Sequence, residues 1–372
     1  MEKYNLLDIC DVYQPKTIAT NEFVPNGKYT VYGANGAIGK YDKYNHEKSE
    51  VMMACRGATC GAINISKPFS WINGNAMVIH PNGQKTILQK YLMYCLKFAD
   101  KKKIISGTAQ PQITRRNLIG FQIPVCNIKE QERIVTRIEE LFSELDKAVE
   151  TLKTTKQQLA VYRQAVLKEA FRDVVTKKTI RELSSFVTSG SRGWAKYYDD
   201  TGARFIRITD LTRDSISLKN DSIQYVNLPN VAEGKRSRLV EGDILVSITA
   251  DLGSVALIPS NIGEAYINQH IAMIRFNNTV QSEYMAWYLK SDYGQKDLLK
   301  NKRGGGKLGL GLDDIRDTCV PVITDSTALK VVKKIDYQLC NCNQMEKMIE
   351  QSLEQAESMR QSILKRAFEG GL

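Results

Sequence analysis

Two clusters of adjacent cations are the residues of this sequence best suited to binding a polyanion. Lys101-Lys102-Lys103 forms one cluster, and the segment from Lys235 to Arg238 forms the other. Neutralising a phosphate backbone takes several cations close together, so both clusters predict phosphate contact. A solvated charged surface is the alternative interpretation of each.

Base readers are a few Arg, Lys, Asn, Gln, Ser or Thr side chains on loops, and for any single candidate a solvated surface side chain is the alternative. In the first 125 residues the candidates for DNA contact are Asn35, Arg56, Asn73, Asn75, Lys101, Lys102, Lys103, Arg115 and Arg116. From residue 176 onward they are Arg192, Trp194, Lys196, Arg207, Thr209, Lys235, Arg236, Arg238, Gln269, Lys302, Arg303 and Lys307.

No set of residues in the sequence predicts catalysis. A DNA methyltransferase would hold its target base with an Asn/Asp-Pro-Pro-aromatic motif, and no Pro-Pro pair occurs. The run 304–307 (Gly-Gly-Gly-Lys) is not a phosphate loop, because Asn301 stands where such a loop has glycine and Leu308 where Ser or Thr would bind magnesium. The three histidines suggest no triad. We expect a protein that is not an enzyme and binds no cofactor of its own.

The cysteines predict neither disulfides nor a metal centre. There are eight, with no Cys-x-x-Cys pair, and a site at Cys55 and Cys60 would need two more ligands. No apolar run approaches the roughly 20 residues that cross a bilayer, and the start of the chain lacks the pattern of a signal peptide. These features predict a cytoplasmic protein with reduced cysteines and no membrane contact.

The excess positive charge is confined to two segments of the chain. The net charge is +11, from 52 Lys and Arg against 41 Asp and Glu. Residues 1–125 carry +8 and residues 176–322 carry +3, whereas 126–175 and 323–372 are neutral. This distribution is expected if the charged segments meet phosphate and the neutral segments meet protein.

The neutral segments are two copies of one element. At an offset of 197 residues, the nine residues from Arg163 to Phe171 align with those from Arg360 to Phe368, and Ile123-Pro124-Val125 aligns with Val320-Pro321-Val322. Eleven of the 49 aligned positions are identical, whereas chance would give roughly three. Duplication is the simplest explanation.

Both copies have the periodicity of long helices. Apolar residues recur at steps of four and three, for example Ile134, Ile138, Leu141 and Leu145, and no proline interrupts either copy. Some 40 residues at about 1.5 Å each make a helix of roughly 60 Å, too long for one element of a compact core. Each copy leaves an apolar stripe uncovered, so we expect the two to pair as an antiparallel coiled coil within the chain.

The charged segments have the pattern of mixed, strand-rich domains. Short β-branched and aromatic runs, such as 29–32 and 271–276, alternate with Gly, Asn and Asp, and each segment then gains one helix, at 88–96 and at 282–290. The fold class is therefore α+β with a twofold internal repeat. The predicted domains are 1–125, the helix 126–175, the second domain 176–322, and the helix 323–372.

The sequence resembles the specificity subunit of type I restriction-modification systems, and the resemblance covers nearly the whole chain. It is carried by the Arg-Gln-x-x-Leu-Lys-x-Ala-Phe helix ends, by Ile123-Pro124-Val125 leading to Glu130-Gln131-Glu132, and by Phe205-Ile206-Arg207-Ile208-Thr209-Asp210-Leu211. The pattern of 242–245 followed by 267–270 is similar to that of the family as well. The second helix departs from it, with Thr327-Ala328-Leu329 in place of the Glu-Gln-Glu triplet.

The resemblance implies a non-catalytic scaffold that reads double-stranded DNA. Each globular domain would read one half of a split target, and the helices would set the spacing. Since one DNA turn is about 34 Å, half-sites about a turn apart are expected. Two methyltransferase subunits would bind the chain and motor-nuclease subunits would join for cleavage, with S-adenosylmethionine, ATP and magnesium held by those partners.

A second interpretation comes from a different class of protein. The coiled coil could hold two protein-binding domains as a non-catalytic adaptor, with the charge excess incidental. Salt dependence separates the two, because DNA binding weakens steeply as salt rises.

Overall fold

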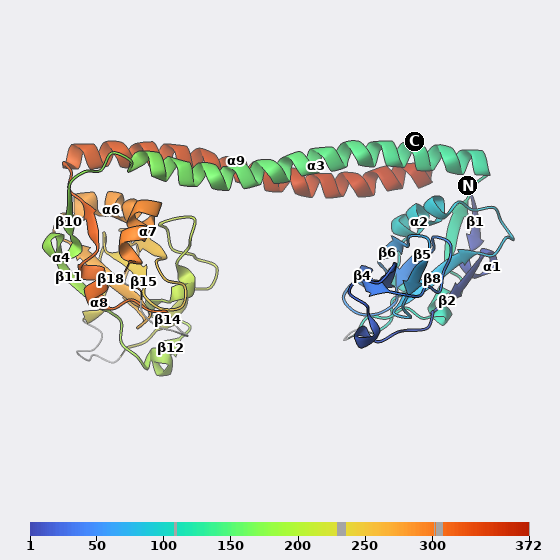
Figure 1. Cartoon of the computed structure of the whole chain (residues 1–372), viewed down its shortest axis with the longest axis horizontal. Helices are drawn as coiled ribbons and strands as arrows, with labels where there is room; N and C mark the ends of the chain where they lie inside the picture. Colours follow the sequence, from blue (N-terminus) through green and yellow to red (C-terminus); the bar gives the residue numbers. More distant parts are fainter. Residues whose placement is uncertain (108–109, 229–235, 301, 303–307, 372) are drawn as a thin grey trace. The chain divides into compact units, whose positions relative to one another are not determined.

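The computed structural model describes residues 1–107, 110–228, 236–300, 302 and 308–371 (Figure 1). The chain forms two compact units. Unit 1 is Met1–Lys153 together with Glu350–Leu372, and unit 2 is Thr154–Ile349. Each long helix contributes one half to each unit, and each unit contains one globular domain. Among the described residues, no helix is both long and apolar enough to span a membrane.

The first globular domain is built on a four-stranded antiparallel sheet in the order β2-β8-β5-β6. A second sheet has the order β4-β3-β7, with β3 and β7 parallel, and β1 pairs with β9. The strands are β1 (Glu2–Asn5), β2 (Cys10–Tyr13), β3 (Tyr29–Gly33), β4 (Gly36–Tyr41), β5 (Val51–Ala54), β6 (Ile63–Ile65), β7 (Ser70–Ile72), β8 (Ala76–Pro81) and β9 (Gln122–Val125).

Helix α2 (Gln89–Phe98) covers one face of the larger sheet and is buried on most sides, from Tyr91 to Leu96. A buried cluster joins this helix to β5, β8 and the ends of both long helices. The remaining elements are short: α1 (Leu6–Ile9), η1 (Thr20–Glu22), η2 (Lys102–Ile104) and η3 (Arg115–Leu118).

The second globular domain repeats this topology with one more strand, β12, at the edge of its smaller sheet. Its larger sheet has the order β11-β18-β15-β16, its smaller sheet the order β12-β14-β13-β17, and β10 pairs with β19. The strands are β10 (Lys177–Thr179), β11 (Ser184–Ser189), β12 (Tyr198–Asp199), β13 (Ala203–Ile206), β14 (Gln224–Val226), β15 (Ile244–Ser247), β16 (Val255–Leu257), β17 (Ala265–Ile267), β18 (Ile271–Phe276) and β19 (Cys319–Pro321).

The equivalence extends to several helices of the two domains, with α7 (Asp292–Leu298) as the main exception among the described residues. Helix α6 (Ser282–Lys290) takes the place of α2, and α4 (Ile180–Leu183) that of α1. Helix α7 follows α6 and has no α-helical counterpart in the described residues after α2. The other short elements are η4 (Trp194–Tyr197), η5 (Ile208–Asp210), η6 (Thr279–Gln281) and α8 (Leu312–Arg316).

The predicted pair of long helices is confirmed as α3 (Ile128–Ala170) and α9 (Asp325–Glu369). In unit 1, Arg360 of α9 bonds Asp146 of α3. In unit 2, Arg163 of α3 donates to Asn343 Oδ1 of α9 at 2.6 Å. Residue numbers fall along α3 where they rise along α9, so the pairing is antiparallel in each unit. The two arginines occupy equivalent positions of the repeat, and so do their acceptors.

Each long helix ends against a globular domain through the same aromatic residue of the repeat. In unit 2, Phe171 at the end of α3 packs edge-on against Tyr284 of α6, with ring centroids 5.2 Å apart. In unit 1, Phe368 near the end of α9 packs in the same manner against Tyr91 of α2, at 5.4 Å. The boundaries predicted at 125, 175 and 322 remain predictions, and the helices begin three residues beyond the first and third of them.

Candidate nucleic-acid interface

Three loops of the first domain meet beyond the ends of β5 and β8. Arg56, just past β5, forms an isolated antiparallel bridge with Gln112. The bridge is held on both sides, because Gly57 N donates to Pro111 O at 3.1 Å and Ile113 N donates to Cys55 O at 3.0 Å. Gly57 has a φ of 81°, which turns the loop and leaves the Arg56 side chain exposed.

The loop between β7 and β8 joins the same place. Cys55 N donates to Asn75 O at 3.2 Å, so Asn75, whose side chain is exposed, lies beside Arg56. Asn73 has a different role. It is 4% exposed, and its Oδ1 accepts from Ile18 N at 3.0 Å and from Trp71 Nε1 at 3.2 Å. The structure therefore places Asn73 inside the loop framework and not on the surface, because its amide holds two loops together.

The second domain builds the same site with other side chains. Thr249, just past β15, bridges Gly309, and Leu310 N donates to Ile248 O at 3.0 Å. The turn is made by Ala250, whose φ of 58° is strained for a residue with a Cβ. Thr249 therefore stands in the second domain where Arg56 stands in the first.

A chain of polar side chains extends this second site. Thr249 Oγ1 lies 2.6 Å from His270 Nδ1, and Gln269 Nε2 lies 2.9 Å from His270 Nε2. The backbone N of His270 donates to Asn268 Oδ1 at 3.1 Å. The structure thus brings the predicted Gln269 together with Thr249 and His270, which sequence reasoning missed. Aligning β5–β8 with β15–β18 could have found them, because they follow the same strands as Arg56 and Asn75.

The lysine cluster of the first domain is divided in two by its hydrogen bonds. Lys101 Nζ donates to Leu96 O at 2.6 Å and to Ala99 O at 2.9 Å, which caps the carboxyl end of α2. Burial lowers the pKa of this lysine. Lys101 therefore belongs to the helix cap and not to a phosphate surface, whereas Lys102 and Lys103 are exposed.

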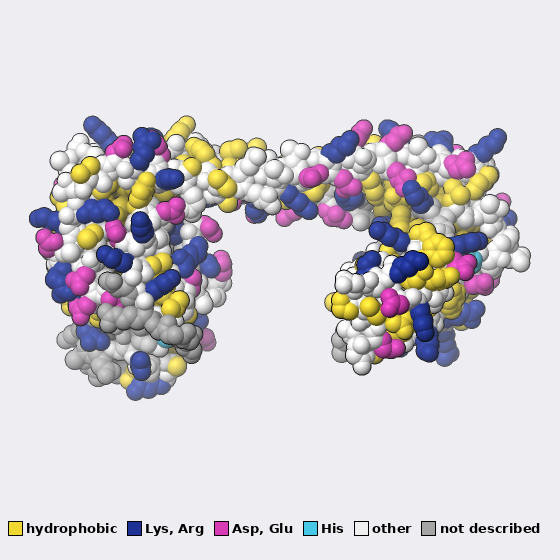
Figure 2. Space-filling view, viewed as in Figure 1, with side chains coloured by type: hydrophobic (Ala, Val, Ile, Leu, Met, Phe, Trp, Pro, Cys, Tyr) yellow, Lys and Arg dark blue, Asp and Glu magenta, His cyan; other side chains and the backbone are white. Residues whose placement is uncertain are grey.

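Arg115 and Arg116 begin η3 and are exposed. Asn35 is also exposed, and its Oδ1 accepts from Asn64 Nδ2 at 3.2 Å. The side chains of these three residues are on the surface of the first domain, where they are accessible to water and to a phosphate group. Figure 2 shows Lys and Arg side chains spread over the visible faces of both globular domains.

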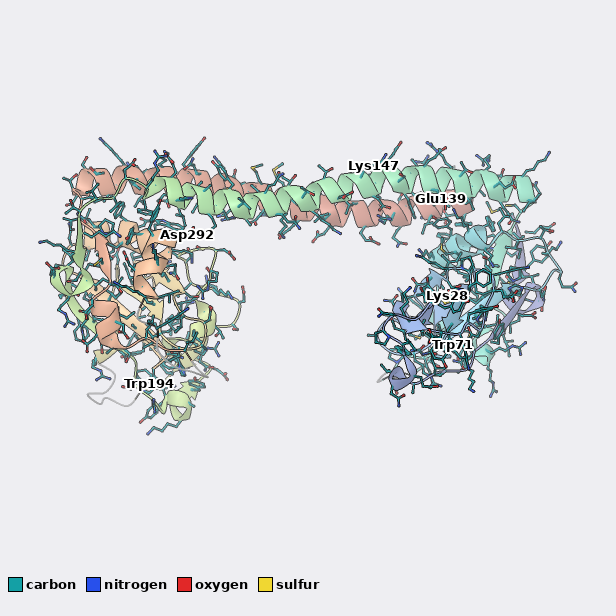
Figure 3. The ribbon with its side chains drawn as sticks, viewed as in Figure 1. Lys28, Trp71, Glu139, Lys147, Trp194 and Asp292 are labelled. Atoms are coloured by element: carbon teal, nitrogen blue, oxygen red, sulfur yellow. The ribbon has the colours of Figure 1, made fainter. Side chains whose placement is uncertain are left out.

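Trp194 in the second domain is a core residue (Figure 3). It is 3% exposed, stacks on Phe205 with ring centroids 5.2 Å apart, and packs edge-on against Tyr266 at 5.3 Å. The structure therefore places this predicted DNA contact in the core of the domain and not on its surface. Its neighbours on either side, Arg192 and Lys196, are exposed.

Arg207 is tied into its own domain. Its Nη2 donates to Ser222 O at 2.8 Å and lies 3.7 Å from Asp210 Oδ1, so the guanidinium orders a loop. Its Nε is buried without a hydrogen-bond partner. Thr209, two residues on, is exposed.

The remaining predicted contacts lie within or next to residues that the structure does not describe. Arg236, Arg238 and Lys302 are exposed, and Arg238 bridges Tyr266. Lys235, Arg303 and Lys307 lie outside the described residues. Within the described ranges, no group of three or more His, Cys, Asp and Glu side chains could hold a metal ion.

Comparison with known proteins points to one family. The family model described as "Type I restriction modification DNA specificity domain" matches residues 1–160 and 177–355. The specificity subunit of the type I restriction enzyme EcoBI of Escherichia coli is 22% identical over 299 residues, which are 72% of this chain and 62% of that protein. The EcoKI specificity subunit of E. coli strain K12 is 23% identical, over 73% of this chain and 63% of that protein. The chain thus spans less than two thirds of the length of either relative.

Solved structures share the fold. A structure described under "complex assembly and conformational transition of the type I R-M system" aligns with a TM-score of 0.76 at 15% identity, covering 100% of this chain and 98% of the other. The HsdS subunit from Thermoanaerobacter tengcongensis aligns with a TM-score of 0.57, also at 15% identity, over 100% and 97% of the two chains.

Proposed function

Because this chain belongs to the family of type I restriction modification DNA specificity domains, we propose that it recognises a bipartite DNA sequence for a restriction-modification complex. Each globular domain reads one half of the target. The two long helices set the spacer and dock two methyltransferase subunits, and motor-nuclease subunits join the assembly. The chain itself performs no catalysis and holds no cofactor, while S-adenosylmethionine, ATP and magnesium bind to the partners.

The observation that carries the proposal is the pair of equivalent loop sites. Both lie past the corresponding strands, β5 in the first domain and β15 in the second, and both are braced by the same backbone bridge. The framework is common, but the polar groups differ: the exposed Arg56 and Asn75 in one domain, and the half-buried Thr249 and Gln269 in the other. A common framework that presents different hydrogen-bonding groups is what two readers of different half-sites require.

The charges support contact with a nucleic acid. Arg56 is one of the cations of a domain segment with a net charge of +8, and its guanidinium can bond a guanine edge through two donors. The helices support a scaffolding role, because the same arginine of the repeat links α3 to α9 in each unit. Their neutral charge favours protein over DNA as their partner.

Exchanging residues 1–125 for the corresponding domain of another family member tests the proposal. The complex with the methyltransferase should then methylate adenines in a target whose one half has changed, while the other half stays the same. Sequencing of methylated sites gives the result directly. A change in both halves, or in neither, would contradict separate reading by the two domains.

Salt dependence tests the adaptor interpretation against this one. The assembled complex should lose DNA affinity with a log-log slope near −0.9 for each phosphate contacted. An adaptor would bind its proteins with little response to salt and would show no sequence-specific DNA binding at all.

A further inference from the structure

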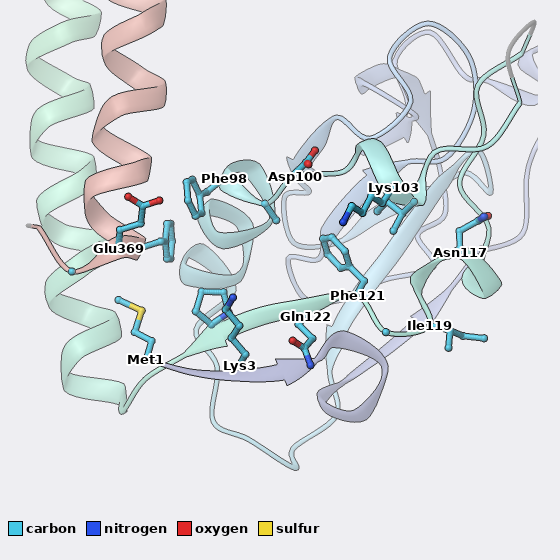
Figure 4. A pocket seen from close by; sticks show the side chains of 16 residues that line it. Met1, Lys3, Phe98, Asp100, Lys103, Asn117, Ile119, Phe121, Gln122 and Glu369 are labelled. Atoms are coloured by element: carbon cyan, nitrogen blue, oxygen red, sulfur yellow. The ribbon is translucent and has the colours of Figure 1, made fainter.

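A cavity of about 950 Å³ opens in the first domain beside the end of α2. Its walls are the end of α2, the paired strands β1 and β9, the loop before β9, and the last residues of α9 (Figure 4). The lining mixes aromatic and aliphatic side chains with two cations and two acids: Phe98, Phe121, Lys3, Lys103, Asp100 and Glu369. All of them belong to unit 1.

In the second domain the corresponding walls are covered by α7. This helix packs against α6 and β19, the counterparts of α2 and β9. Asp297 of α7 accepts a charged hydrogen bond from Lys177 Nζ at 2.7 Å and another from the Tyr288 hydroxyl at 3.2 Å. Leu298 is 1% exposed and packs in the core. An acid and an apolar residue therefore anchor α7.

Lys3 is the counterpart of Lys177. Lys3 pairs with Pro124 across β1 and β9, as Lys177 pairs with Pro321 across β10 and β19. Among the described residues, however, Lys3 forms no ion pair with any acid. The first domain therefore has the cation that holds α7 in the second domain, and within the described part of the chain this cation is unpaired although Asp100 and Glu369 line the same cavity.

The chain after α2 is too short to fill this place. Fourteen residues separate Phe98 from Ile113, whereas eighteen separate the equivalent Ser291 from Leu310. Four residues are about one helical turn. Among its described residues, the shorter segment makes the 3₁₀ turn η2 and no α-helix, and Ile119 at the rim of the cavity is left 71% exposed.

We propose that this cavity docks a short helical segment of one methyltransferase subunit, in the place that α7 takes in the second domain. The segment presents a carboxylate to Lys3 and an apolar side chain to Phe98 and Phe121. This inference rests on the proposed function. Because α7 occupies the corresponding place in the second domain, the contact is made by one of the two methyltransferase subunits and not by the other.

The test uses the full chain, reconstituted with its methyltransferase subunit and measured by sedimentation. Lys3→Glu should weaken binding of the second methyltransferase subunit more than about tenfold, so that a two-to-one assembly becomes one-to-one. Ile119→Glu should do the same, and an exposed rim residue tolerates this change without loss of folding. In both variants the unfolding midpoint of the chain should stay that of the wild type.

Lys177→Glu is the matched control, because it breaks the internal pair with Asp297. It should lower the unfolding midpoint of the second domain and leave the two-to-one assembly intact. If Lys3→Glu and Ile119→Glu both assemble two-to-one with unchanged affinity, the docking site is wrong and the proposed function stands. If the wild-type chain binds no methyltransferase, the proposed function fails, and this inference fails with it.

Discussion

The two globular domains place an ion pair at the same position but build it from different residues. In the second domain Asp243, just before β15, accepts from Arg275 of β18, with Oδ2 and Nη2 2.7 Å apart. In the first domain the equivalent pair is Glu50, before β5, with His80 of β8, and Oε2 and Nδ1 are 2.8 Å apart. The carboxylates are 0% and 7% exposed. Both domains therefore have a buried carboxylate with a basic partner beside the central strands. The partner is an arginine in the second domain and a histidine in the first.

The two ion pairs differ in whether the basic partner is always charged. An arginine is charged at all relevant pH values and binds a carboxylate through two donors, as Arg275 does with Nε and Nη2. A histidine makes one such bond, and the contact is an ion pair only when the ring carries its proton. We infer that the second domain depends on its pair more than the first domain does.

Replacing the acid in each domain should give the largest effect and tests that inference. Asp243→Asn leaves a guanidinium facing a buried neutral group and should lower the free energy of unfolding of the second domain by about 3 kcal/mol. Glu50→Gln should cost the first domain only about 1 kcal/mol, because the His80 ring is 41% exposed and can turn to water. Hydrogen exchange of each domain's strand amides in urea measures both values.

If the two substitutions lowered the free energy of unfolding by equal amounts, the second domain would not depend on its ion pair more than the first. Arg275→Met together with Asp243→Asn serves as the control for the buried charge. If the loss in the single variant comes from an orphaned cation, the double variant should recover part of it.

The loop sites offer the next largest effect. Arg56→Ala removes a side chain that can bond a guanine through two donors, so it should cost about 1 to 3 kcal/mol of affinity for the first half-site alone. Thr249→Val keeps the volume of its side chain but loses the hydroxyl that braces His270, and should weaken the second half-site by less. Binding of the assembled complex to targets mutated in one half at a time measures both. If Arg56→Ala weakened the two halves equally, Arg56 would be a general phosphate contact and not a reader.

The smallest effect is expected where the long helices meet the domains. In unit 1, Lys90 Nζ of α2 lies 2.7 Å from Glu139 Oε1 of α3. The equivalent residues in unit 2 are both acids, Glu283 of α6 and Asp336 of α9. Burial raises the pKa of both carboxyls, and for Glu283 the charge of Asp336 adds to the rise. The helix contact is thus attractive in one unit and repulsive in the other.

The direction of these pKa shifts sets a pH window. A carboxyl whose pKa is raised on folding destabilises the fold at neutral pH, and the penalty is relieved as the pH falls below the raised pKa values towards the ordinary ones of 4.5 and 3.8. Glu283→Gln should therefore stabilise unit 2 by less than about 1 kcal/mol at pH 7 and have no effect near pH 3.5. Lys90→Gln should destabilise unit 1 slightly at pH 7. Urea titrations at the two pH values check both, and a gain from Glu283→Gln that persists in acid would contradict the electrostatic cause.

The long helices of the repeat could be predicted from sequence, whereas the structure of the globular domains could be predicted only in part. The long helices, their antiparallel pairing and the family follow from Arg163–Phe171 and its second copy, because these residues hold one register in both copies. The order of the strands did not follow, since the two domains preserve their hydrogen-bonding pattern with few residues in common. The pairing of Glu50 with His80 could not be predicted from sequence, because it depends on β5 and β8 lying side by side in the sheet.

The candidate site shows the same limit. Arg56, Asn75 and Gln269, which the sequence marked only as candidates for DNA contact, lie in the loop sites. Trp194 and Lys101 do not, because residue type cannot reveal whether a polar or aromatic group is already occupied by its own domain. Sequence reasoning missed His270 because this residue comes to lie beside Thr249 only through the pairing of β15 with β18.

The aromatic anchor at the end of α9 has a consequence for the order in which the protein is made. Phe368 completes the core of the first domain, yet it leaves the ribosome more than two hundred residues after Met1–Lys153, the first part of that unit. At 5 to 20 residues per second this delay is roughly ten to forty seconds. The domain synthesised first is therefore the last to be finished, and its exposed aromatic surface has to be shielded in the meantime.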